Sequence, residues 1–158
     1  MRKLLLLLVS LALLAGTAVS ASAAPADQRQ TIVVAVRTSD GVNTCQVGAT
    51  GPIHGAGTCG FEFKYGLNLF LLVFPNGTVD LLATAEHETD HSSPCLHTAR
   101  FTGSYEILGG SGAYAGASGS GTISGQSAEV SKICGGVSRA VFVFTASGSA
   151  IIGGPISG

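Results

Sequence analysis

Apolar and polar residues alternate with a period of two along most of the chain, which is the pattern of β-strands with one buried face. Residues 31–38 (TIVVAVRT) and 61–65 (FEFKY) show it first, and residues 97–108 (HTARFTGSYEIL) separate into an apolar face and a polar face. Residues 121–130 and 138–152 continue it with β-branched and aromatic side chains, which favour strands. No later segment has the pattern of a helix of three turns.

A hairpin is predicted where two apolar runs, 67–74 and 78–85, flank Pro75, Asn76 and Gly77. Asn-Gly between apolar runs is a strong hairpin signal. A two-residue turn there predicts three pairs of opposed residues, namely Phe74 with Val79, Leu72 with Leu81 and Phe70 with Ala83. These pairs form one apolar face for a core.

The other face of this hairpin mixes apolar and polar residues. It carries Leu67, Leu69, Leu71, Val73 and Leu82 beside Asp80, Thr84 and Glu86. So large an apolar band is rarely left exposed on a monomer. We therefore expect either a homo-oligomer or a loop such as residues 48–57 to cover it.

The predicted fold is all-β. At least six strands with polar or Gly-rich connections, and no crossover helices, indicate an antiparallel sheet. We predict a closed barrel of about eight strands, with a β-sandwich as the alternative.

The N-terminus has the pattern of a secretory signal peptide. Arg2 and Lys3 precede an apolar run from Leu4 to Ala15, and the small residues Ala21 to Ala23 suit a cleavage site. The run is shorter than the roughly 20 residues of a membrane span. We expect residues 1–23 to be the signal peptide, 24–30 a flexible segment and 31–158 a single barrel domain, secreted and without a membrane span after cleavage.

Composition limits the partners. Without Arg2 and Lys3, acidic residues outnumber basic ones, and no basic stripe follows a nucleic-acid backbone. We expect no nucleic-acid partner.

The four cysteines, Cys45, Cys59, Cys95 and Cys134, all follow the signal peptide. In an oxidising compartment two disulfides are the default, and the absence of a CxxC pair argues against a zinc site. We predict Cys45–Cys59, which closes a short Gly-rich loop, and then Cys95–Cys134 by elimination.

Residues 87–97 (HETDHSSPCLH) imitate the metzincin zinc motif, with Pro94 in the position of its glycine. That motif needs a helix with both histidines on one face. Here it follows a predicted strand, the inner positions offer no apolar helix face, and Pro94 cannot adopt a positive φ. We therefore predict an acidic loop, with only an adventitious metal site at His87 and His91, and no cofactor; a zinc metalloprotease is the remote alternative.

Residues 101–125 (FTGSYEILGGSGAYAGASGSGTISG) carry a family resemblance. The segment resembles the signature IxGGTGxY/FxGAxGxGxxxG of secreted bacterial proteins with an allene oxide cyclase-like or dirigent-like barrel, with Ser111 in place of the threonine. The matching positions are Gly109, Gly110, Gly112, Tyr114, Gly116, Ala117, Gly119 and Gly121. The resemblance implies an eight-stranded barrel and, from trimeric plant relatives, self-association. It supplies no active site.

Two functions follow as hypotheses. The first is a secreted non-enzymatic barrel that binds an apolar small molecule or serves as a surface or interaction module; the second is a cyclase-like or dirigent-like isomerase acting on a hydrophobic substrate. Whether the protein is an enzyme is left open, and no catalytic residue is assigned. The polar candidates for the barrel interior are Glu62, Asn68, Asp80, His97, Tyr105 and Glu106. A lumen filled by Phe70, Phe101, Phe142 and Phe144 would exclude a ligand and leave the interaction module.

Overall fold

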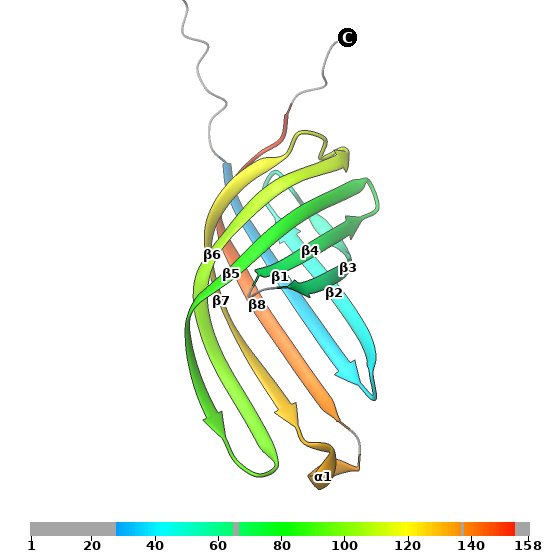
Figure 1. The fold of residues 1–158 in the computed structure, drawn as a ribbon. Helices are drawn as coiled ribbons and strands as arrows, with labels where there is room; N and C mark the ends of the chain where they lie inside the picture. Colours follow the sequence, from blue (N-terminus) through cyan, green and yellow to red (C-terminus); the bar gives the residue numbers. More distant parts are fainter. Residues whose placement is uncertain (1–27, 65–66, 137, 154–158) are drawn as a thin grey trace, which may run out of the picture.

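The computed structural model describes residues 28–64, 67–136 and 138–153, which form one closed antiparallel barrel (Figure 1). Its strands follow the chain in order: β1 (Gln28–Ser39), β2 (Val42–Thr50), β3 (Gly55–Lys64), β4 (Leu67–Phe74), β5 (Gly77–Ser92), β6 (Leu96–Gly112), β7 (Ser118–Val130) and β8 (Arg139–Ile151). The barrel closes because β1 pairs with β2 on one edge and with β8 on the other. The predicted barrel is confirmed, and the sandwich alternative is wrong.

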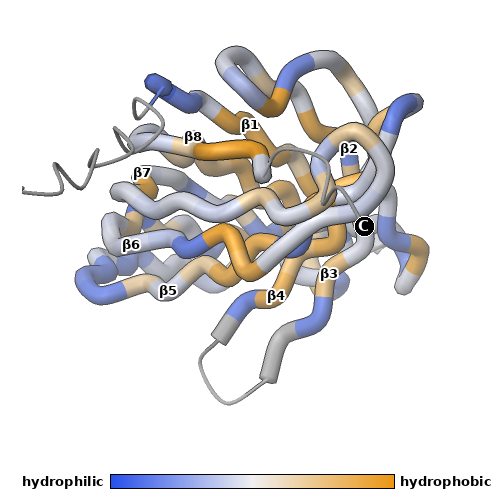
Figure 2. Tube along the Cα trace, turned by 90° about the horizontal axis from the view of Figure 1, so that it is seen from above, coloured by the Kyte–Doolittle hydropathy of each residue, from blue (hydrophilic) through white to orange (hydrophobic). Residues whose placement is uncertain are grey.

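The core follows from the period-two alternation. Where all eight strands surround the interior, the inward positions of β1, β4, β5, β6 and β8 are mostly apolar, and Figure 2 shows apolar stretches around the barrel. The fully buried side chains of this core include Ile32, Val34, Phe70, Leu72, Val79, Leu81 and Ala146. One buried face on every strand requires the strands to meet around a common interior, which a closed barrel provides.

Strand structure extends beyond the predicted segments in two places. β1 begins at Gln28, three residues before the expected start at Thr31, and Gln30 has no exposed surface. The segment between Cys45 and Cys59, expected to be a Gly-rich loop, is mostly a β2–β3 hairpin with residues 51–54 as its turn. The glycines concealed this hairpin because they weaken the strand pattern.

The predicted register of the β4–β5 hairpin is wrong by two residues. Phe74 pairs with Gly77, and Leu72 pairs with Val79. The turn is therefore Pro75-Asn76, and neither residue has a positive φ. An Asn-Gly turn would pair Pro75 with Thr78, but proline has no N–H to donate across that pair, and its φ near −65° suits the first central position of a turn instead. A shift of two keeps every side chain on its predicted face.

The barrel is complete only over part of its length. β3 and β4 are short, whereas β5 and β6 remain paired as far as Ser92 and His97 (Figure 1). Register shifts in this pair lie at Asp80/Leu81 and Ala85/His87. The lower parts of β5, β6, β7, β8 and β1 thus project beyond β3 and β4, and the inward Glu88 and Asp90 are exposed there.

Both predicted disulfides are confirmed, as Cys45–Cys59 and Cys95–Cys134. The first joins β2 to β3. The second joins the β5–β6 turn to α1 (Lys132–Gly135), which Ser131 caps at its N-terminus. Within the described residues, no helix has the length and apolar character to span a membrane.

Candidate functional site

The lumen, the first candidate site, is filled with phenylalanine side chains. Phe101 and Phe142 stack with ring centroids 5.0 Å apart, and Phe70 and Phe144 lie 5.1 Å apart. Phe142 also contacts Phe144 at 5.7 Å. Gly125 is the cross-strand partner of both Phe101 and Phe144, and a Cβ there would collide with the Phe101 ring. The glycine therefore leaves the space that the two rings occupy.

The upper end of the lumen is closed by Tyr114, which comes from the Gly-rich turn between β6 and β7. Its side chain is 1 % exposed and packs edge-on against Phe74, with ring centroids 5.5 Å apart. Its hydroxyl donates to the carbonyl of His54 at 2.9 Å. Tyr114 therefore points into the barrel, and its hydroxyl makes a structural hydrogen bond.

Gln30 is the one buried polar residue among those described. Its Nε2 donates to the carbonyls of Thr31, Thr50 and Ile53, and its Oε1 accepts the backbone N–H of Ile53 at 2.9 Å. This clasp holds the β2–β3 turn over β1. This clasp was not predicted, although Gln30 continues the inward alternation of Ile32 and Val34.

The six polar candidates for the interior divide between the two faces. Tyr105 is buried, and burial raises the pKa of its hydroxyl above the ordinary value. The neighbours in sequence of Glu62, Asp80 and Glu106 point inward, so these three carboxylates lie on the outer face. Asn68 lies inward and half-buried opposite Ala83, and His97 lies inward at the projecting end. The six therefore form no common site.

Of the residues of the zinc motif, His87, Glu88 and His91 lie in strand β5 and His97 lies in strand β6, so the predicted acidic loop is wrong for these positions. His87 and His91 are both exposed and outward, and four residues of strand separate them by roughly 13 Å. They cannot share a metal ion at that distance. Over the described parts of the chain, no three histidine, cysteine or acidic side chains group as metal ligands.

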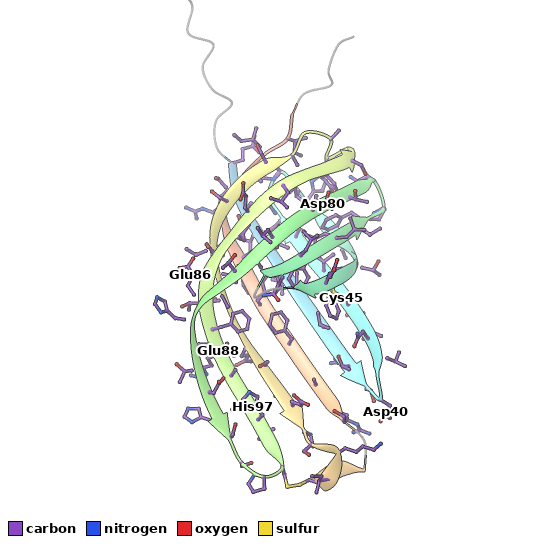
Figure 3. All side chains as sticks on the ribbon, viewed as in Figure 1. Asp40, Cys45, Asp80, Glu86, Glu88 and His97 are labelled. Carbon is purple, nitrogen blue, oxygen red and sulfur yellow. A yellow bond between two sulfur atoms is a disulfide. The ribbon has the colours of Figure 1, made fainter. Side chains whose placement is uncertain are left out.

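His97, Ser92 and Asp90 lie together on the inner face of the projecting end, where Figure 3 labels His97. Ser92 Oγ lies 2.7 Å from His97 Nδ1, and His97 Nε2 lies 3.9 Å from Asp90 Oδ1. The order resembles a nucleophile, a base and a carboxylate. However, the histidine and aspartate side chains are 44 % and 55 % exposed, so water competes for these contacts. The adjacent backbone N–H, that of Ser93, already donates to the Leu96 carbonyl at 2.8 Å, and the group supports no catalytic assignment.

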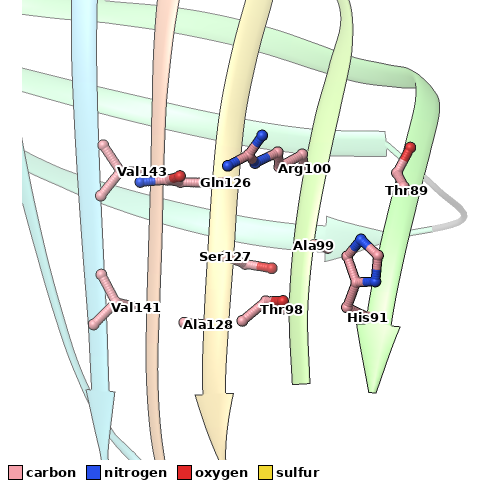
Figure 4. Close-up of a pocket in the computed structure, with 10 residues that line it drawn as sticks. All are labelled: Thr89, His91, Thr98, Ala99, Arg100, Gln126, Ser127, Ala128, Val141 and Val143. Atoms are coloured by element: carbon pink, nitrogen blue, oxygen red, sulfur yellow. The ribbon is translucent and has the colours of Figure 1, made fainter. Parts of the chain in front are cut away.

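A concavity lies on the outer surface, over the projecting parts of β5, β6, β7 and β8 (Figure 4). It is a shallow depression of about 640 Å³. Its lining includes Thr89 and His91 from β5, Arg100 from β6, Gln126 from β7, and Val141 and Val143 from β8. The register shift at Ala85/His87 turns this part of β5 to present Thr89 and His91 outward. This site was not predicted, because such a register shift has no clear signal in the sequence.

A second outer surface is the apolar row of β4, formed by Leu69, Leu71 and Val73. These side chains are 40 %, 44 % and 39 % exposed. With this exposure, residues 48–57, which were expected as a possible cover, do not shield them. The row is therefore open within one chain.

Comparisons of the chain with protein-family models, with curated proteins and with solved structures find no match.

Proposed function

We propose that the protein is a secreted, non-enzymatic barrel that serves as an interaction module through its outer surface. The observation that carries this proposal is the filled lumen, because a barrel that binds or converts an apolar molecule needs an interior cavity for it. Phe70 and Phe144 are completely or almost completely buried, and Phe101 is only 7 % exposed. The described concavities lie on the outer surface or at the projecting end.

The cysteines support the secreted part of this proposal. All four form disulfides, and such bonds persist in oxidising compartments. The resemblance to allene oxide cyclase-like and dirigent-like barrels stays a prediction. A packed interior gives no support to its isomerase activity.

For the apolar row of β4 we propose a second copy of the chain as the partner. Three exposed apolar side chains follow one another on the outer face of one strand, and symmetric association buries the same patch on both subunits. Leu82 of β5, half-buried, extends the row because it pairs with Leu69.

Native mass spectrometry tests the association. We expect an oligomer at micromolar concentration, and a monomer after Leu71→Asp, because a buried unpaired carboxylate costs several kcal/mol. The matched control is Leu108→Asp, since Leu108 is 53 % exposed on β6 and lies outside the row. A wild-type monomer, or equal dissociation of both variants, would contradict a role of the row.

The same instrument tests the filled lumen. After incubation with a lipid extract, we expect each wild-type subunit to keep the mass of the disulfide-bonded polypeptide. A stoichiometric apolar adduct that survives Leu71→Asp would place a ligand inside the barrel and overturn the proposed function.

A further inference from the structure

We infer that the outer depression over β5–β8 binds a carboxylated polysaccharide, with Arg100 holding a carboxylate. The inference deepens the proposed function, because it names a partner for the outer surface. It concerns a different face from the apolar row of β4.

The first support is the separation of charge across the projecting sheet. Directly opposed residues of an antiparallel pair share a face. Glu88 is opposite Phe101, Asp90 is opposite Ala99 and Glu129 is opposite His97, so these three carboxylates lie on the inner face. The outer face of the same strands carries Arg37, Arg100, Arg139, His87 and His91.

No carboxylate occupies an outward position between the shift at His87 and the lower ends of these strands, within their described residues. The nearest acids lie at the margins. Glu86 accepts a hydrogen bond from Ser104 at 2.6 Å above the depression, and Asp40 lies in the β1–β2 turn. The outer face is therefore basic although the chain as a whole is slightly acidic.

The second support is the setting of Arg100. It is exposed, and Thr89 and Gln126 are its cross-strand partners on either side. Figure 4 shows its guanidinium extending over β7, the strand that carries Gln126. The sole ion pair of the described residues, His97–Asp90, lies on the other face. A guanidinium between a hydroxyl and a carboxamide offers several donors to one carboxylate.

The third support selects the class of polyanion. Val141 and Val143 line the same depression, and they provide an apolar surface for the C–H face of a sugar ring. The described outward positions of this region hold no phenylalanine or tyrosine on which a nucleic-acid base could stack. A concave surface also fits a chain that enters it better than a flat bilayer. Charge, hydrogen-bond donors and shape together favour a carboxylated sugar chain.

Isothermal titration calorimetry with polygalacturonate tests this inference, with neutral dextran as the reference polymer. We expect binding to polygalacturonate alone, and a loss of affinity of about tenfold or more in Arg100→Gln, because a charge-assisted hydrogen bond is lost. The matched control is Arg29→Gln, which removes an exposed arginine at the upper end of β1, outside the depression. We expect it to bind within about twofold of the wild type, because surface charges at a distance are screened by salt.

A third variant distinguishes specific binding in the depression from nonspecific attraction of a polyanion to the basic outer face. We expect Gln126→Leu, which keeps the charge, to weaken binding several-fold. No binding by the wild type, equal losses in Arg100→Gln and Arg29→Gln, or full affinity in Gln126→Leu would overturn the inference. So would equal or stronger binding to duplex DNA or to phosphatidylglycerol vesicles. An apolar adduct in the lumen would instead overturn the proposed function, so the two failures are distinguishable.

Discussion

Replacement of Phe144 by alanine is expected to lower the free energy of unfolding by about 3–5 kcal/mol, the range for large-to-small changes of a buried phenylalanine. Phe144 is 1 % exposed and contacts both Phe70 and Phe142. Gly125, its partner on β7, has no side chain that could move into the space. Urea unfolding of the oxidised protein, followed by circular dichroism, measures the change.

The control for this variant is Val141→Ala on the same strand. Val141 points outward and is 41 % exposed, so we expect a loss below about 1 kcal/mol. Similar losses in the two variants would mean that the phenylalanine rings do not form the packed interior.

Removal of the Cys95–Cys134 disulfide, by Cys95→Ser with Cys134→Ser, is expected to cost about 4 kcal/mol in the chain-entropy model. The two cysteines are 39 residues apart, so the reduced chain regains the freedom of a long loop. The bond also holds α1 against the β5–β6 turn, where Ser131 N–H donates to the Cys95 carbonyl at 3.0 Å. Equilibrium unfolding of the double variant measures the loss.

The comparison is the variant that lacks Cys45–Cys59, whose cysteines are 14 residues apart. We expect a smaller loss of about 3 kcal/mol from the shorter loop. A negligible change in the free energy of unfolding of the Cys95–Cys134 variant would contradict this prediction. It would mean that the unfolded chain between these two cysteines has little conformational freedom even without the disulfide.

The sequence predicts the barrel because alternation is a property of each strand, visible without knowledge of its neighbours. The inward positions Phe70, Phe101 and Phe144 follow from it directly. The register of a hairpin is harder to predict, because it depends on which two residues form the turn. Pro75 occupies the first turn position here, and the pairing of β4 with β5 is therefore two residues away from the predicted one. The β2–β3 hairpin was not predicted for a similar reason. Its glycines have no side chain to continue the apolar–polar alternation, so these strands become recognisable only from their pairing with neighbouring strands.

The outer depression could not be predicted from the sequence, because it also depends on strand pairing. Arg100, Gln126 and Val143 are far apart in the chain and become neighbours only through the pairing of three strands. Along the sequence each is an ordinary outward residue of an amphipathic strand. Only the register brings them into one row, and only the shift after Ala85 brings Thr89 beside them.

The closure of the barrel by β1 and β8 has a consequence for a chain as it is synthesised. Gln28 pairs with Ala150, so the first strand obtains its second partner only when the end of the last strand has emerged. Until then β1 and β7 are open edges, and open edges are templates for pairing with another chain. Contacts between residues so distant in sequence also make folding slow. The nascent protein therefore passes through a stage in which the same edges that complete the monomer are available to the β8 of a neighbouring molecule.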